Sequence, residues 1–119
     1  MKSGEINSLF KNLSKVVKNP RSDLKYKNKF TLLVSVVLSA QCTDVNVNNV
    51  TRNIYPKYNK PEHFVRLGRK KIEKLIKSIG LFRNKAKSVY LLSKQLIEKH
   101  NGKVPKNFDD LLALPGVGR

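Results

Sequence analysis

The segment whose residues most clearly suggest ligand binding is Leu111 to Arg119, where the turn Pro115-Gly116-Val117-Gly118 follows three apolar residues. Pro115 fixes one backbone dihedral, whereas Gly116 and Gly118 can take positive φ and let another molecule approach the backbone closely. A glycine turn that opens a helix directs unpaired N–H groups outward, and these groups bind anions such as phosphate. On this segment alone, an ordinary helix-ending Pro-Gly turn is the alternative.

The other reactive side chains do not form a catalytic or metal-ligating set. His63 and His100 have no ligand-spaced partners, so a surface or capping role is expected for both. Cys42 is the single cysteine; it cannot form an internal disulfide, which fits a reducing cytoplasm, and packing is its expected role. Glu98 and the pair Asp109-Asp110 are too isolated for an acid–base couple, and we expect no metal or cofactor bound by this chain.

The charge balance points to a polyanionic partner. The chain has 25 Lys and Arg against 8 Asp and Glu, a net charge of +17, which favours nucleic acid over a membrane surface. However, 19 of the basic residues are lysines and 12 asparagines accompany them, a bias that an AT-rich genome would also impose. A row on one predicted helix, Lys70, Lys71, Lys74 and Lys77, is expected to be a solvated face, with a DNA-facing stripe as the alternative.

The length of 119 residues corresponds to one domain or part of one. The longest apolar run, Leu32 to Ala40, is interrupted by Ser35 and Ser39 and is too short to cross a bilayer. Met1 to Gly4 leads into an amphipathic helix rather than a secretion signal. We therefore expect a cytoplasmic, nucleoid-associated protein with no membrane partner.

Helical periodicity dominates the pattern, and no alternating strand pattern appears. The apolar spacing predicts a first helix from about Gly4 to Lys18, ended by Asn19-Pro20, and a helix over Phe30–Leu38 that is buried on most sides. Thr43 is a plausible N-cap for a third helix, whose stripe of Val47, Val50, Ile54 and Tyr58 predicts that it continues to Tyr58.

Short helices then follow. The pattern predicts a helix from Pro61 to Arg66 and another from Lys70 to Ser78, with Gly80 as a C′ glycine. Asn84 is a candidate cap for a long helix that reaches about His100 and turns its inner face along Ala86, Val89, Tyr90, Leu92, Leu96 and Ile97. A last helix covers Phe108–Ala113, with Asn107 as its cap. The fold class is therefore all-α, with about seven helices.

Three ordered signatures carry a resemblance to a known family: Leu38-Ser39-Ala40-Gln41-Cys42-Thr43-Asp44, Ile79-Gly80-Leu81-Phe82-Arg83-Asn84-Lys85-Ala86, and Leu114-Pro115-Gly116-Val117-Gly118-Arg119. Together, and with Asn101 to Pro105 as a further match, they make the chain similar to the endonuclease III family, the bifunctional DNA glycosylases and abasic-site lyases of the helix-hairpin-helix superfamily. Nearly the whole chain takes part in this resemblance.

The resemblance implies an incomplete helix-hairpin-helix glycosylase fold. Residues 1–20 would form the N-terminal helix of a domain that holds an iron–sulfur cluster, and residues 21–119 most of a six-helix barrel domain that ends in the hairpin. The family binds its 4Fe-4S cluster through cysteines that are absent from this sequence. The resemblance also implies that Gly116, Val117, Gly118 and Arg119 contact a DNA phosphate near the lesion.

The resemblance gives two further residues a role in base flipping. An enzyme that acts on a base in a duplex must extrude it and fill the gap. By the family's motifs, Gln41 would enter the gap and bond to the orphaned base, and Leu81 would wedge between bases to replace the lost stacking. Read without the resemblance, Gln41 is a polar residue at a helix end and Leu81 an ordinary buried leucine.

The family's catalytic groups do not occur in this sequence. In the family, a lysine directly after the Gly-Val-Gly-x hairpin attacks the sugar C1′, and an aspartate lies farther on. Here x is Arg119, whose guanidinium does not deprotonate to a usable amine near neutral pH. The chain therefore resembles an N-terminal portion that ends just before the catalytic lysine, and we expect no catalytic residue within it and no activity from it alone.

The resulting functional expectation is base excision repair of oxidised pyrimidines and β-elimination at abasic sites in duplex DNA. The DNA partner would contain damaged bases or abasic sites, and a complementary C-terminal fragment is a possible second partner. The alternatives are a non-catalytic DNA-binding remnant and the product of a degraded or split gene.

Overall fold

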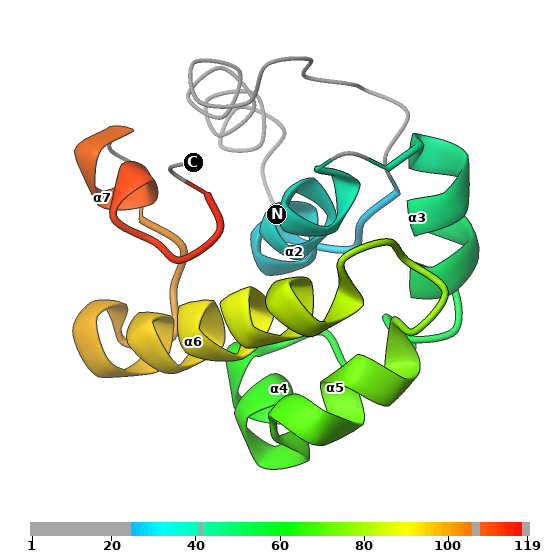
Figure 1. The fold of residues 1–119 in the computed structure, drawn as a ribbon. Helices are drawn as coiled ribbons and strands as arrows, with labels where there is room; N and C mark the ends of the chain where they lie inside the picture. Colours follow the sequence, from blue (N-terminus) through cyan, green and yellow to red (C-terminus); the bar gives the residue numbers. More distant parts are fainter. Residues whose placement is uncertain (1–24, 41, 106–107, 118–119) are drawn as a thin grey trace.

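The computed structural model describes residues 25–40, 42–105 and 108–117, and these residues are helical with no strand among them. They form α2 (Lys29–Ser39), α3 (Asp44–Thr51), α4 (Pro61–Leu67), α5 (Arg69–Leu75), α6 (Phe82–His100) and α7 (Phe108–Leu112) (Figure 1). The predicted all-α class is confirmed. The predicted first helix and the proposed domain over residues 1–20 lie outside the described residues.

Helix α2 is the buried helix that the sequence predicts. It begins with a capping box: the Asn28 side chain accepts from the backbone N–H of Thr31 at 2.8 Å, and the backbone N–H of Asn28 donates to the Thr31 hydroxyl at 2.9 Å. Eight of its 11 residues are buried, on all sides of the helix. A short helix satisfied at its start and apolar all round is stable only inside a core.

Helix α3 begins as predicted, with the Thr43 side chain accepting from the N–H of Asn46, but it ends at Thr51 rather than at Tyr58. Hydrogen-bonded turns follow, among them Ile54 N–H to the Thr51 carbonyl at 2.9 Å. Ile54 and Tyr55 are both buried. Neighbours in a continuous helix diverge by about 100°, so the tight turns are what allow both side chains to reach the core.

The boundaries around residue 80 differ from those predicted. Helix α5 ends at Leu75, not at Ser78, and Gly80 is not a C′ glycine, because the positive φ lies at Leu81 (60°) instead. Helix α6 begins at Phe82, so Asn84 is not its cap. Ile76 and Ile79 are both buried and joined by a tight turn. This turn reverses the chain, so that α6 packs back on α5.

The C-terminal end of α6 agrees with the sequence. Asn101 (φ 55°) and Gly102 (φ 78°) take left-handed conformations, and the N–H of Gly102 donates to the Leu96 carbonyl at 2.8 Å. This pattern satisfies carbonyls that the helix end leaves without a partner. Asn101-Gly102 therefore ends α6, as its composition predicts.

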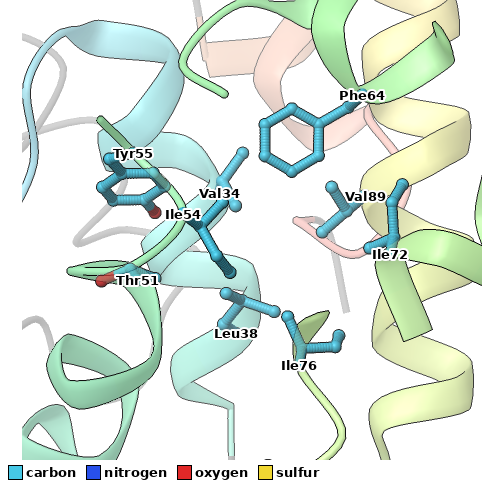
Figure 2. A pocket seen from close by; sticks show the side chains of 9 residues that line it. All are labelled: Val34, Leu38, Thr51, Ile54, Tyr55, Phe64, Ile72, Ile76 and Val89. Carbon is cyan, nitrogen blue, oxygen red and sulfur yellow. The ribbon is translucent and has the colours of Figure 1, made fainter. Parts of the chain in front are cut away.

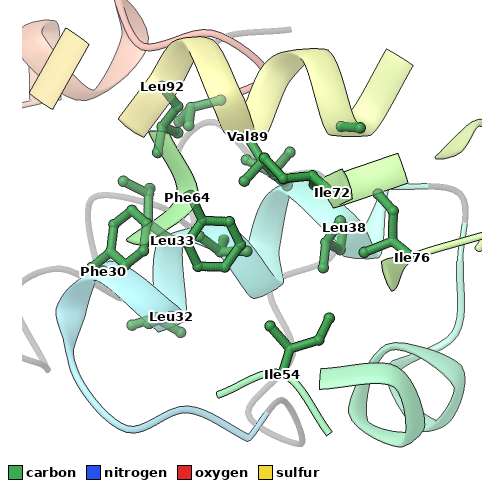
Figure 3. Packing of buried hydrophobic residues seen from close by; sticks show 14 of the residues in the cluster. Phe30, Leu32, Leu33, Leu38, Ile54, Phe64, Ile72, Ile76, Val89 and Leu92 are labelled. Atoms are coloured by element: carbon green, nitrogen blue, oxygen red, sulfur yellow. The ribbon is translucent and has the colours of Figure 1, made fainter. Parts of the chain in front are cut away.

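Helix α6 lies between α2 on one side and α4 and α5 on the other (Figure 1). Its inner face joins residues of α2, α4 and α5 in one apolar cluster (Figure 3). Of the six residues predicted to face inward, Ala86, Val89, Leu92 and Leu96 are buried and Tyr90 and Ile97 are half-buried. The core therefore fixes the direction of α6 relative to the end of α2.

A small apolar cavity of about 10 Å³ lies within this core (Figure 2). Its nine lining residues come from all the helices but α7 and from the turns after α3 and α5: Val34, Leu38, Thr51, Ile54, Tyr55, Phe64, Ile72, Ile76 and Val89. This volume is just large enough for about one water molecule, but a buried water needs two to four polar partners. The cavity is a packing defect without the features of a ligand site.

Tyr55 provides a polar contact beside this cavity. Its hydroxyl donates to the Thr31 carbonyl at 2.9 Å and lies 2.5 Å from the Ser35 hydroxyl oxygen. Burial raises the pKa of Tyr55 well above its ordinary value, and the hydrogen bond with Ser35 partly opposes this. The ionised phenolate is therefore strongly disfavoured in the folded chain.

We expect the stabilising effect of neutral Tyr55 to be complete below the unfolded pKa of about 10 and to be lost as the pH rises towards the higher folded pKa. Tyr55→Phe should cost about 1–2 kcal/mol at pH 8, because two buried hydrogen-bonding groups lose their partner. By pH 11 the difference should shrink by roughly 1.4 kcal/mol. Urea unfolding of both proteins at pH 8 and pH 11 measures this, and a gap that stays constant with pH would contradict it.

Candidate nucleic-acid interface

Leu81 is an exposed apolar residue on a strained turn. It immediately precedes α6, has φ 60° and ψ 31°, and is 57% exposed. A leucine in the left-handed region is a genuine outlier, costing roughly 1–2 kcal/mol. Its exposure also excludes the alternative that Leu81 is an ordinary buried leucine. Strain together with an exposed apolar side chain is typical of a functional position.

The backbone after α2 forms the second segment of the site. Ala40 is the C-cap of α2, with φ −59° and ψ 120°, so the chain leaves the helix there. The N–H of Cys42 donates to the Ser39 carbonyl at 3.0 Å, and the side-chain amide of Asn46 contacts the Cys42 sulfur at 3.3 Å. Gln41 lies between these anchored residues in the chain but outside the described residues. Its proposed role stays a prediction.

Lys85 connects these two segments; it lies within the second family signature, but no role was predicted for it from the sequence. Its backbone N–H donates to the Leu81 carbonyl at 3.0 Å, while its ammonium donates to the carbonyls of Leu38 (2.9 Å) and Ala40 (2.5 Å). The residue is 6% exposed, which makes it the one buried basic side chain in the described part of the chain. Its position four residues before Val89, in line with the apolar stripe of α6, is the sequence signal that could have found it.

Burial lowers the pKa of Lys85 from its ordinary value, and the nearby Cys42 thiol partly opposes this. Two carbonyl oxygens accept from the ammonium at the C-terminal end of α2, where the helix dipole favours a positive charge. These contacts compensate for the desolvation of the ammonium.

The third segment is the turn after α7. A Cβ built on Gly116, which has φ 79°, would lie 2.8 Å from the Cβ of Ser88 and 3.1 Å from Cγ1 of Val37. Ser88 is one turn beyond Lys85 in α6, and Val37 is in the last turn of α2. The turn therefore lies against the same ends of α2 and α6 that Lys85 joins.

The structure also shows why this glycine is needed. The side chains that approach Gly116 closely come from the chain's own α2 and α6. From the sequence, we predicted that another molecule would approach the backbone there. Val117 is 2% exposed, so its side chain belongs to the core, and its backbone N–H already donates to the Leu114 carbonyl at 3.2 Å. Gly118 and Arg119 lie outside the described residues. Phosphate binding by this turn stays a prediction.

Other candidate residues have the capping and surface roles expected of them. The Nδ1 of His63 accepts from the N–H of Asn59 at 3.1 Å, which is a capping contact. The four predicted surface lysines are all exposed: Lys70, Lys71, Lys74 and Lys77. Glu73, on the same helix, pairs with Arg69 at 3.5 Å. The face formed by α5 and the turn after it therefore presents mainly positive charge to solvent.

An iron–sulfur cluster does not fit the residues of this chain. The sequence has one cysteine, and the described residues contain no group of three or more His, Cys, Asp or Glu side chains close enough to hold a metal ion. Within the same residues, no helix is both long and apolar enough to cross a membrane.

Comparisons with known proteins agree on one family. Residues 34–117 match the profile of the HhH-GPD superfamily base excision DNA repair protein. The chain is 47% identical over its whole length to endonuclease III of Rickettsia conorii, covering 57% of that protein. It is 50% identical over 97 residues to endonuclease III of Bacillus subtilis, covering 82% of this chain and 44% of that one.

Solved structures give the same result. A trapped endonuclease III–DNA covalent intermediate, an estranged-adenine complex, superposes with a TM-score of 0.80 at 41% identity, covering 100% of this chain and 56% of the other. A thermostable thymine-DNA glycosylase has a TM-score of 0.73 at 24% identity, covering 97% and 54% of the two chains, which supports the fold alone. The chain spans about half the length of these relatives. It belongs to the HhH-GPD superfamily of base excision DNA repair proteins, among the endonuclease III homologues.

Proposed function

We propose that this chain is the lesion-recognition part of an endonuclease III-type DNA glycosylase and abasic-site lyase acting on oxidised pyrimidines in duplex DNA. Leu81 would be the wedge between bases, Gln41 would pair with the orphaned base, and residues 116–119 would bind a phosphate through their backbone N–H groups. The observation that carries the proposal is the strained, exposed leucine at the start of α6.

Leu81 has the properties that a wedge requires. A residue inserted into a base stack must be apolar, project from the surface, and stand on backbone that cannot give way. Leu81 is apolar and 57% exposed, and its carbonyl is held by the first hydrogen bond of a 19-residue helix. An exposed leucine gains free energy when it leaves water to stack between bases.

The proposed reaction needs an amine that this chain does not supply. An enzyme amine attacks C1′ of the damaged nucleotide, the C1′–N bond breaks, and the base leaves with a proton. The C1′–O4′ bond then opens, with O4′ taking up a proton, to give an iminium. Removal of a C2′ proton from this iminium lets the C3′–O bond break with the phosphate as leaving group, and the strand is nicked. In the family, the attacking amine belongs to the lysine that follows the hairpin. Arg119 cannot act in its place. The family's iron–sulfur cluster would likewise be held by residues outside this chain.

We therefore expect the 119-residue chain to give no borohydride-trapped adduct with an abasic duplex at a catalytic rate. Hydride reduces the iminium to a stable secondary amine, so trapping reports Schiff-base formation directly. A chimera that appends the part of the Rickettsia conorii endonuclease III not covered by this chain should give an adduct within a single turnover. The readout is the covalent band on a denaturing gel.

Two controls define this result. An intact duplex, and an abasic duplex without borohydride, should give no band with either protein. Slow adducts are expected from any of the 19 lysines, so the comparison is between rates. An adduct that the chain alone forms as fast as the chimera would overturn the prediction of inactivity.

A second candidate function is non-catalytic DNA binding, which the exposed lysine face of α5 favours. Such binding would depend on phosphate contacts alone and would not distinguish damaged from intact duplex. Equal affinity of the chain for the two duplexes would favour this function.

A further inference from the structure

At the end of α2, the carbonyls of Val36 and Ser39 have local partners, the Ser39 hydroxyl and the Cys42 N–H, but those of Leu38 and Ala40 are bound from elsewhere in the chain. Its last turn has no basic residue, and its C-cap, Ala40, has no hydrogen-bonding side chain. The final carbonyls of any helix need partners from outside the helix. Here the partner is the ammonium of Lys85, which reaches the carbonyls of Leu38 and Ala40 from a residue 45 to 47 positions later in the chain.

The same residue anchors the turn that presents Leu81. Its backbone N–H makes the first hydrogen bond of α6, to the Leu81 carbonyl at 3.0 Å. One residue therefore holds, through its backbone, the segment that carries Leu81 and, through its side chain, the carbonyl of the residue directly before Gln41.

The burial of Lys85 shows that this contact is specific. A surface lysine is solvated and mobile, whereas Lys85 is 6% exposed and has two carbonyl acceptors. An ammonium taken from water requires such acceptors, and removing it would leave both carbonyls without their partner. Lysine fits here because its long apolar stem can cross the core side of α6 and still place a charge at the end of α2.

We propose that Lys85 is a positioning residue that fixes the backbone at Ala40, directly before Gln41, relative to the Leu81 turn, so that Gln41 and Leu81 can enter the base stack together. The inference rests on the proposed function, which supplies the roles of Gln41 and Leu81. Lys85 contacts no DNA itself. It acts through the carbonyl of Ala40 on one side and the carbonyl of Leu81 on the other.

The test compares Lys85→Met with Lys87→Met in the 119-residue chain. Both substitutions remove one positive charge from α6, but Lys87 is exposed. Each protein is titrated at fixed salt with an intact duplex and with one containing a tetrahydrofuran abasic analogue, and the ratio of the two affinities is the damage preference. Fluorescence of 2-aminopurine opposite the analogue reports whether the stack is opened.

We expect Lys85→Met to lower the damage preference about tenfold or more and to abolish the 2-aminopurine signal, since a displacement of about 1 Å in a positioning group can cost up to roughly 100-fold. Its affinity for intact duplex should fall only as far as that of Lys87→Met, which should keep the damage preference. Lys85→Arg, which keeps the charge and the donors, should restore part of the preference and of the fluorescence signal.

The outcomes separate the two proposals. A folded Lys85→Met that keeps the preference, or a Lys87→Met that loses it equally, overturns the positioning role alone. A wild-type chain without any damage preference overturns the proposed function and the positioning role with it. If Lys85→Met does not fold, Lys85→Gln and Lys85→Arg are compared instead. If both variants keep the full damage preference, the contact of Lys85 with the two carbonyls is not needed and the positioning role is overturned. A damage preference that falls as this contact weakens supports the role.

Discussion

Phe64→Ala should lower the free energy of unfolding by about 3–5 kcal/mol. Phe64 is 2% exposed and packs edge-to-face on Phe30 of α2, with 5.6 Å between ring centroids, and on Tyr58 at 6.4 Å. It also lines the apolar cavity of about 10 Å³ (Figure 2). Truncation would enlarge a void that is already present and remove the ring through which α4 meets α2. The cost should therefore lie in the upper part of the range.

The measurement is urea unfolding followed by circular dichroism, with the slope on denaturant checked for constancy. Phe64→Leu, which keeps most of the volume, should cost less than about 1.5 kcal/mol. Leu112→Ala provides a surface control, since Leu112 is 37% exposed, and it should cost well below Phe64→Ala. A loss of less than about 1 kcal/mol for Phe64→Ala would show that α4 is not part of the cooperative core.

The elements with strong local signals could be predicted from the sequence. The N-cap at Thr43 and the end of α6 near His100 depend on neighbouring residues, and the structure has both. The capping box at Asn28 is equally local but was not predicted. The largely apolar segment Phe30–Leu38 correctly indicated a central buried helix. These features need no knowledge of the rest of the fold.

The features that were mispredicted depend on residues distant in sequence. Helix α3 ends at Thr51, and Tyr55 in the turns that follow bonds to Thr31 and Ser35 of α2, a contact that the apolar stripe does not reveal. The strain at Leu81 contradicts the residue's own preference, and only the packing of the two helices around the turn explains it. A buried lysine at position 85 was missed because lysine is almost never buried unless it is paired, and its acceptors are 45 to 47 residues away.

Gly116→Ala should lower the free energy of unfolding by about 2–4 kcal/mol. A non-glycine residue in the left-handed region costs about 1–2 kcal/mol, and Gly116 has φ 79°. In addition, the new methyl would lie 2.8 Å from the Cβ of Ser88 and 3.1 Å from Cγ1 of Val37, and overpacking of this kind costs about 1–3 kcal/mol. Part of that cost would be relieved by a shift of the turn.

Gly102→Ala is the matched control. Gly102 has nearly the same φ, 78°, but a Cβ there would meet only Oε2 of Glu62, at an ordinary contact distance of 3.4 Å. It should therefore show the backbone cost alone. Chemical denaturation of both variants measures the difference, and equal losses would show that the contact with α2 and α6 carries no energy.

Ser88→Gly in the Gly116→Ala background separates two explanations of the glycine. If Gly116 is required because the chain's own helices crowd it, removing the Ser88 Cβ should restore about 1 kcal/mol or more relative to the sum of the single changes. If glycine is required only for DNA to approach, the two changes should add, and the double variant should lose DNA affinity without regaining stability. The 2.8 Å approach favours the first explanation. In that case Gly116 allows the turn to pack closely against α2 and α6, and any phosphate binding would depend on the N–H groups that follow it.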